Sequence, residues 1–186
     1  MKFICIFEDL NCLLTIKEDN EKLNEFDKIF DNWTDLEYLH NFFSIHEKDL
    51  NRPIWEGISI EQAVIETRKE AIRFREYLRK ISKKPANERI SFLIKLFKPL
   101  SNNQIVISFL EKKKAYGSRD KTWLRIYALK AGDDTYIITG GAIKLTHRMN
   151  EREHTSNELK KLEKCKQFII EEGIVDDEGL IELLEI

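Results

Sequence analysis

The sequence is poor in cysteine and has no long apolar segment. Its three cysteines, Cys5, Cys12 and Cys165, form no CxxC pair. This scarcity argues against a disulfide framework or a cysteine-rich zinc site and favours a reducing compartment. No run of about eighteen apolar residues occurs, so no membrane-spanning helix is predicted. Glu8 and Asp9 interrupt the apolar start, which lacks the pattern of a signal peptide; we therefore expect a first strand and a cytoplasmic protein.

Several motifs of catalysis and cofactor binding are also missing. Gly140 and Gly141 fit neither GxxxxGK(S/T) nor GxGxxG, so they predict a bulge or bend in a strand and not a phosphate loop. No GxSxG motif is present, which disfavours a serine hydrolase. The four histidines lack the spacing of a zinc site. We therefore expect neither a metal nor a cofactor.

Charge, by contrast, is abundant and unevenly distributed. Residues 1–61 carry 6 Lys and Arg against 14 Asp and Glu, and residues 155–186 carry 4 against 9. Residues 62–154 carry the remaining 21 basic and 10 acidic residues, a net charge of +11. Solvated helix faces often produce such clusters, but a basic stretch of 93 residues also makes a phosphate-bearing partner such as nucleic acid a serious candidate.

Hydrophobic periodicity predicts a single α+β domain spanning residues 1–186, with strands and helices first, then a small antiparallel sheet and a C-terminal helix. Apolar residues three and four apart predict helices from about 21 to 43 and from 59 to 81, and a shorter helix that ends before Pro99. TSNE at 155–158 has the spacing of a capping box and predicts the start of the last helix, with Gly173 as its C-cap. The predicted strands are 3–7, 12–16, 104–110, 122–130, 135–139 and 142–149, and a basic loop is predicted at 112–120.

Alternation along two of these strands groups polar and aromatic side chains on one open face of the sheet. Aromatic rings among fixed cations suit single-stranded nucleic acid, in which bases stack and phosphates pair with cations. The simpler interpretation is the ordinary wet face of an antiparallel sheet. The residues of this predicted face are Trp123, Arg125, Tyr127, Lys144, Thr146 and Arg148.

Three segments resemble a known protein family. "TWLRIYAL", "TYIITGGAIKLTHRM" and the helix "TSNELKKLEKCKQFI" are similar to the RelE/ParE-like toxins, and most similar to the branch that contains the HigB toxins. Arg125 and Tyr127 fall on the first pattern of that branch, and Gly141, Lys144 and Thr146 fall on the second. The resemblance implies a RelE-like core at about 59–173. It leaves an N-terminal extension at 1–58 and an acidic tail at 174–186.

The resemblance also implies a function: the toxin of a type II toxin–antitoxin pair, which cuts mRNA on the ribosome and is neutralised by a protein antitoxin of the helix-turn-helix type. In this reaction the 2′-hydroxyl attacks the adjacent phosphate, so a base and stabilising cations are needed. Arg125 and Arg148 would clamp the phosphate, and Lys144 would act as base or electrostatic stabiliser. His147 or His154 would be the competing base, and Tyr127 a stacking or hydrogen-bonding group. The expected RNA-binding residues are Lys112, Lys113, Lys114, Tyr116, Arg119, Lys121, Trp123, Arg152 and His154.

Two other interpretations remain open. A RelE-like protein without chemistry would bind a protein target, and this alternative gains weight because Leu145 stands where the family pattern has a second lysine. A nucleic-acid-binding accessory protein would bind RNA in a salt-dependent way and leave it uncut.

Overall fold

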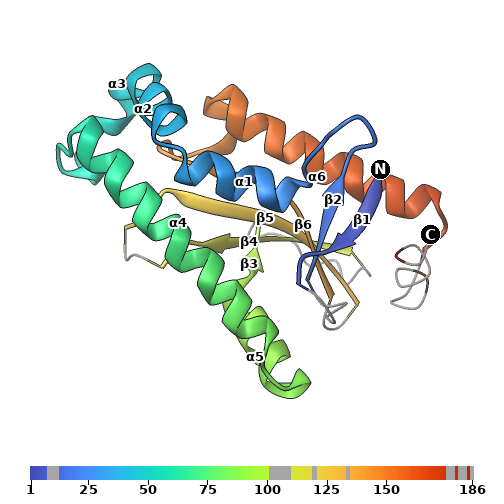
Figure 1. Ribbon diagram of the computed structural model, residues 1–186. Coiled ribbons are helices and arrows are strands. Elements are labelled where there is room, and N and C mark those ends of the chain that lie inside the picture. Colours follow the sequence, from blue (N-terminus) through green and yellow to red (C-terminus); the bar gives the residue numbers. More distant parts are fainter. Residues whose placement is uncertain are drawn as a thin grey trace.

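A computed structural model describes residues 1–7, 13–100, 110–118, 121–132, 135–174, 179 and 184. It shows an α+β fold in which helices lie on both sides of one mixed sheet (Figure 1). The elements are β1 (Lys2–Cys5), β2 (Leu13–Lys17), α1 (Glu25–Thr34), α2 (Leu36–Ile45), α3 (Glu47–Leu50), the short 3-10 helix η1 (Pro53–Trp55), α4 (Ile60–Ser82), α5 (Ala86–Leu96), β3 (Lys98–Pro99), β4 (Leu110–Tyr116), β5 (Leu124–Ala131), β6 (Thr135–Ile143), the 3-10 helix η2 (Met149–Glu151) and α6 (Glu153–Glu171).

The six-stranded sheet has the order β1-β2-β6-β5-β4-β3. All neighbouring strands are antiparallel except β2 and β6, which pair in parallel through Leu13–Thr15 and Tyr136–Ile138. This parallel pair joins the first strands of the chain to the strands that follow α5. Residues 1–58 are therefore an integral part of the fold, because β1 and β2 complete the sheet and α1 packs on β6.

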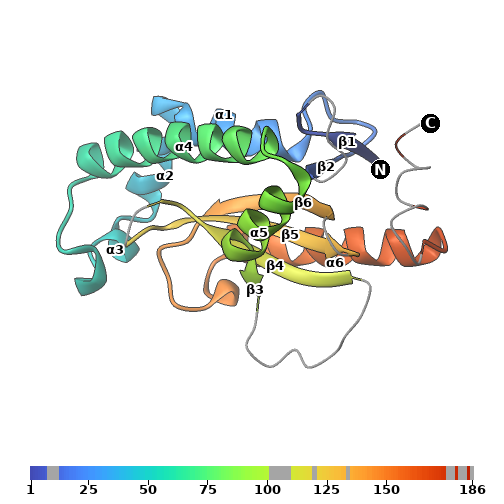
Figure 2. The same cartoon turned by 90° about the horizontal axis from the view of Figure 1, so that it is seen from below.

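Both faces of the sheet are covered (Figure 2). Helices α1, α2 and α4 pack on one face, where Phe30, Phe74 and Ile126 belong to the larger hydrophobic core. Helix α6 packs on the other face, where Cys165 and Tyr127 belong to a second core. Alternate residues of β5 therefore enter different cores, as expected for a strand that is buried on both sides.

Several helix boundaries follow from local sequence signals. Ser59 caps α4 through the backbone N–H of Gln62, whose side chain accepts a hydrogen bond from the Ser59 N–H. Asp35 caps α2 through the N–H of Tyr38 and divides the predicted helix 21–43 into α1 and α2. At the C-terminus of α6, Gly173 has a φ of 72°. Its N–H and that of Ile174 bond to carbonyls of the last helical turn, which satisfies those groups as in a Schellman motif.

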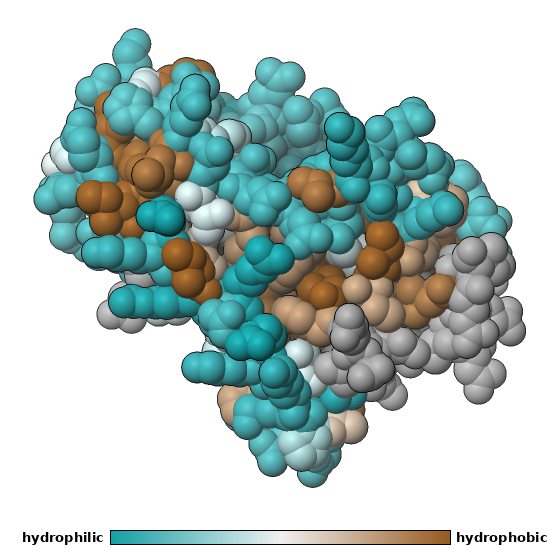
Figure 3. All heavy atoms as spheres, viewed as in Figure 1, coloured by the Kyte–Doolittle hydropathy of each residue, from teal (hydrophilic) through white to brown (hydrophobic). Residues whose placement is uncertain are grey.

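The exposed residues of α4 also agree with those predicted from the sequence. Figure 3 shows that the visible face is mostly hydrophilic, with exposed hydrophobic side chains gathered over the end of the molecule formed by α2 and α4. Leu36 and Ile45 of α2 and Ile65 and Ile72 of α4 are exposed. The basic residues of α4 are exposed as well, as the helical periodicity predicts: Arg68, Lys69, Arg73, Arg75, Arg79 and Lys80.

Three predicted elements are wrong. Residues 112–116 were expected in a loop but belong to strand β4, which is paired along its whole length with β5. The predicted strand 142–149 ends at Ile143, because the chain then leaves the sheet. TSNE does not cap α6: the helix begins at Glu153, and the Thr155 hydroxyl donates back to the carbonyl of Arg152. The predicted strand 104–110 lies outside the described residues except for Leu110.

The two consecutive glycines lie inside β6, where the register with β5 shifts between Tyr127 and Ala128, as the predicted bulge requires. Each glycine also permits a close approach. A Cβ at Gly140 would overlap the Glu158 carboxylate of α6. A Cβ at Gly141 would lie 2.9 Å from the carbonyl oxygen of Arg125 and 3.1 Å from Ile29 Cδ1. The glycines thus let both helix layers approach the strand closely.

Gly141→Ala tests this packing. The added methyl group meets the backbone of β5, which cannot move independently, so we expect a loss of about 1–3 kcal/mol of unfolding free energy. Urea unfolding followed by circular dichroism measures the change. An unchanged midpoint with an unchanged slope would show that the sheet has room at this position.

Candidate functional site

A cationic pocket of about 310 Å³ lies where the chain leaves β6 and passes η1. Its polar lining consists of Arg52, Arg125, Lys144, Thr146 and His147. Its apolar lining consists of Pro53, Ile54, Trp55 and Leu145. None of the described lining residues is acidic, so the pocket can attract an anion.

Arg125 is fixed in the wall of this pocket by backbone carbonyls. Its Nη1 donates to the carbonyl oxygens of Thr122 and Leu124, each at 2.8 Å. Its guanidinium lies over the ring of Tyr116, 4.1 Å from the centroid, in a cation–π contact. Burial lowers the pKa of Arg125. Its ordinary pKa is so high that the guanidinium stays charged at neutral pH.

Lys144 is held in a similar way. Its Nζ donates to the carbonyl oxygens of Thr146 at 2.6 Å and His147 at 2.5 Å. Burial lowers the pKa of Lys144. The Arg125 cation and, more weakly, the Lys114 cation also lower it, whereas the Glu151 carboxylate raises it. The ammonium group is therefore close to other cations; the Glu151 carboxylate attracts it, but the two form no ion pair in the described part of the chain.

The structure brings together part of the predicted catalytic set. Arg125, Lys144 and His147 line the same pocket, whereas Arg148 is exposed and does not line it. Tyr127 is only 1% exposed and packs under α6, because both faces of β5 are covered. Burial raises its pKa, and its hydroxyl has no hydrogen-bond partner among the described residues.

The predicted open face is therefore wrong for its aromatic residues. Trp123 is 1% exposed and lies in the larger core, where its Nε1 donates to the Thr67 hydroxyl at 2.8 Å. Thr146 is also buried, at 6% exposure. Of the predicted face, Arg125 and Lys144 remain accessible at the pocket and Arg148 is exposed outside it.

Most of the other predicted RNA-binding cations are engaged in ion pairs. The pairs are Lys112 with Glu163, Lys113 with Glu111, Lys121 with Glu56 and Arg152 with Asp49. Lys114 instead donates to the Leu100 carbonyl at 3.0 Å and lies over the ring of Tyr116, which is exposed. Arg119 lies outside the described residues. Among the predicted site cations, Lys114, Arg125, Lys144 and Arg148 form no ion pair in the described chain, and Lys114 and Arg125 both lie over the ring of Tyr116.

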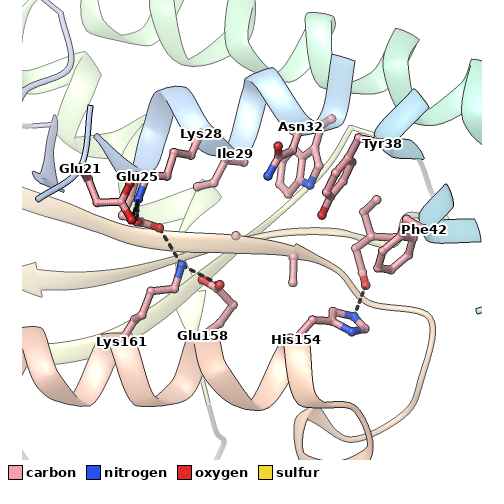
Figure 4. A pocket seen from close by; sticks show the side chains of 14 residues that line it. Glu21, Glu25, Lys28, Ile29, Asn32, Tyr38, Phe42, His154, Glu158 and Lys161 are labelled. Atoms are coloured by element: carbon pink, nitrogen blue, oxygen red, sulfur yellow. Dashed lines mark hydrogen bonds and ion pairs between the residues drawn. The ribbon is translucent and has the colours of Figure 1, made fainter. Parts of the chain in front are cut away.

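The last predicted residue, His154, lines a different pocket of about 370 Å³. This second pocket lies beside the last residues of β6, which come after the residues that pair with β2. Helices α1 and α2 lie on one side of the pocket and α6 lies on the other (Figure 4). His154 Nε2 lies 3.0 Å from the Ile143 carbonyl oxygen, and its ring contacts Phe42 edge-on. Burial lowers its pKa.

A lysine connects the two helix layers in this second pocket. Figure 4 shows Lys161 of α6 between Glu158 of the same helix and Glu25 of α1. Its Nζ lies 2.7 Å from Glu158 and 2.6 Å from Glu25, which also binds Lys28 at 2.9 Å. Burial alone would raise the pKa of Glu25, but the two lysines lower it. We call these four residues the acid–base clasp.

Glu158 is the unusual member of the clasp. Burial raises its pKa to about 7, although Lys161 and the nearby Gly141 N–H oppose the rise. One of its oxygens, Oε2, is buried and forms no hydrogen bond of normal geometry within the described structure. Glu158 therefore changes its charge close to neutral pH.

The sequence interpretation missed Arg52 and Trp55 in the cationic pocket and Glu25, Glu158 and Lys161 in the clasp. Arg52 and Trp55 lie far from Arg125 in the sequence, and only the tertiary fold brings them close. For Glu158, the helical period of α6 was an available signal, since the residue stands on the same face as Leu162 and Cys165. A carboxylate on an apolar face of a helix indicates a buried acid.

Comparison with protein-family models, curated proteins and solved structures gives no match. Across the residues that the structure describes, no group of three or more His, Cys, Asp and Glu side chains is arranged to hold a metal ion. No helix in the described ranges combines the length and apolar character that a membrane span requires.

The pKa of Glu158 predicts a pH-dependent stability. Because its folded pKa of about 7 exceeds its ordinary pKa of 4.5, the folded state holds more protons between these pH values. Stability should therefore fall as the pH rises from about 4.5 to 7, by about 3 kcal/mol at most, and then level off.

Urea unfolding of the wild type and of Glu158→Gln from pH 4.5 to 8 measures this effect. The other carboxylates titrate in both proteins, so the difference in unfolding free energy between the two isolates the contribution of Glu158. The wild type should lose stability relative to the variant across this window. Parallel curves would show that Glu158 is already ionised in the folded protein at pH 5.

Proposed function

We propose that the cationic pocket binds a phosphate of single-stranded RNA and that this protein cleaves RNA there without a metal. One observation carries the proposal: Arg125 and Lys144, from β5 and the segment after β6, line one pocket whose described lining has no carboxylate. A guanidinium and an ammonium held side by side suit a phosphodiester, which presents two negatively charged oxygens.

The reaction places clear demands on these residues. The 2′-hydroxyl loses a proton and attacks the phosphorus; the bond to the 5′-oxygen breaks, and that oxygen receives a proton. Arg125, which is charged at neutral pH, stabilises the negative charge that develops on the phosphate oxygens. His147 lines the pocket, is exposed and can accept the proton. Lys144, with its lowered pKa, supplies either the base or a second stabilising charge.

The resemblance to RelE/ParE-like toxins supplies the biological setting of the proposal. In that setting the substrate is mRNA on the ribosome, the location is the cytoplasm, and an antitoxin neutralises the protein. The net charge of residues 62–154 favours an acidic antitoxin segment, which would compete with RNA for the same cations.

A second function, binding without cleavage, is favoured by the way Lys144 is held. Its ammonium group already donates to two carbonyl oxygens, which stabilise the protonated form and oppose its use as a base. Tyr127 is buried and Arg148 lies outside the pocket, so two of the five predicted catalytic residues do not reach a bound phosphate in this arrangement. A pocket of this kind would hold RNA and leave it intact.

Cleavage is tested by adding the purified chain to a translating bacterial extract and mapping new mRNA 5′ ends. The proposal predicts cuts that require translation, and Arg125→Ala/Lys144→Ala should reduce the cutting rate by about 100-fold or more, because both phosphate cations are lost. The matched control is Arg79→Ala/Lys80→Ala, which removes the same charge from the exposed face of α4. Circular dichroism confirms that each variant is folded.

Equal cutting by the wild type and the pocket variant would contradict the proposed site. Intact mRNA together with retained RNA binding would instead support the function of binding without cleavage.

Salt dependence tests the phosphate contacts separately. If Arg125 and Lys144 each neutralise one phosphate, the slope of log K against log salt concentration for a short RNA should be about −1.4. Lys144→Met keeps most of the apolar stem and removes the charge, so the slope should decrease in magnitude by about 0.7. Fluorescence anisotropy of a labelled oligonucleotide at several salt concentrations measures it. A slope that the variant leaves unchanged would exclude Lys144 from the contact.

A further inference from the structure

The cationic pocket has an apolar half that phosphate binding does not use. Trp55, Ile54 and Pro53 of η1 supply this apolar lining together with Leu145. A bare phosphate has no use for such a surface, whereas a nucleotide combines a charged phosphate with a flat apolar base. The division of the pocket into a cationic and an apolar half therefore fits one nucleotide of a chain.

Trp55 is the residue best placed to contact the base. The protein has three tryptophans. Trp33 and Trp123 are 2% and 1% exposed, so neither can stack on a ligand. Trp55 is only partly buried and lines the pocket, so part of its indole ring is accessible there. It takes the role predicted for Trp123, on whose ring it packs edge-on with the ring centroids 5.2 Å apart.

The position of the Trp55 ring is fixed before any ligand binds. Its Nε1 donates to the Leu145 carbonyl at 3.1 Å, which ties η1 to the segment that carries Lys144. The packing on Trp123 supports the other side of the ring system. A ring held in this way loses little conformational entropy when a base stacks on it, which favours binding.

We infer that η1 is the base-binding wall of the site, and that Trp55 stacks on a base of single-stranded RNA whose phosphate is held by Arg125 and Lys144. This inference rests on the proposed function only for the nature of the ligand, not for its cleavage. Because every base has a π face and the described lining has no carboxylate, the stacking should tolerate many sequences. The inference also gives residues 52–55, within the predicted extension, a role in the site.

Tryptophan fluorescence of the full chain tests the inference directly. The titrants are a single-stranded RNA oligonucleotide, an abasic ribose-phosphate chain of the same length, and an RNA duplex, with binding followed in parallel by anisotropy. The oligonucleotide should quench part of the emission. The abasic chain should bind more weakly without quenching, and the duplex, whose bases are already stacked, should not quench.

Variants separate stacking from charge. Trp55→Ala should weaken binding of the oligonucleotide by about 5- to 150-fold and leave binding of the abasic chain unchanged. Trp55→Phe keeps an aromatic ring and should bind within a few-fold of the wild type while the quenching is lost. Tyr77→Ala, which removes an exposed aromatic residue of α4, is the matched control and should bind like the wild type. Thermal unfolding confirms that each variant is folded.

The possible failures are distinguishable. If Lys144→Met weakens binding but Trp55→Ala binds both titrants like the wild type, the phosphate site stands and the base-binding wall is wrong. If no titrant binds, the proposed function fails and this inference fails with it. Equal losses for the RNA and abasic chains in Trp55→Ala would assign Trp55 a purely structural role and overturn the inference.

Discussion

The burial of β6 on all sides is the constraint on which the rest of the structure depends. It pairs with β5 on one edge and β2 on the other, and both α1 and α6 pack on it. A strand in this position must have few charged groups on either face, and TYIIT meets that requirement, since Tyr136, Ile137 and Ile138 are buried between two buried threonines. Gly140 and Gly141 then allow the two helix layers to approach closely before the chain leaves the sheet. Four residues of the pocket lining, Lys144 to His147, follow directly after β6, so their position is set by the core.

The same two-sided burial explains what the sequence could and could not reveal. The long helix α4 was predictable because its apolar stripe and the Ser59 cap are local signals that agree. The pairing of β5 with β6 was also predictable, because its signals are local in the sequence as well. The facing of Tyr127 was not, because alternation groups residues into faces but does not say which face is covered. Trp123 precedes β5 and enters the same core as Leu124, so strand alternation does not apply to it. Here α6 returns to cover the second face, so Tyr127 is buried instead of exposed.

The candidate site was also predictable only in part. Arg125 and Lys144 were found from short motifs that surround them in the sequence. Arg52 and Trp55 were not found, because they approach these residues only through the tertiary contact between η1 and Leu145. Lys112 and Lys113 were assigned to RNA because they form a basic run, yet each lies beside a carboxylate in the fold. Net charge along a sequence thus overstates the charge available at a surface, since it cannot show which cations are already paired.

What distinguishes the cations of the pocket is the nature of their partners. Asp49 binds both Arg52 and Arg152, and Glu151 also lies near Arg52, so these guanidiniums are largely neutralised. Arg125 and Lys144 are held by backbone carbonyls, whose dipoles fix the position of a cation without cancelling its charge. Burial lowers the pKa of both groups, and the nearby Arg125 cation lowers that of Lys144 further. An anion in the pocket would offset the unfavourable effect of Arg125 on the charged form of Lys144, and this is the physical basis of the proposed phosphate binding.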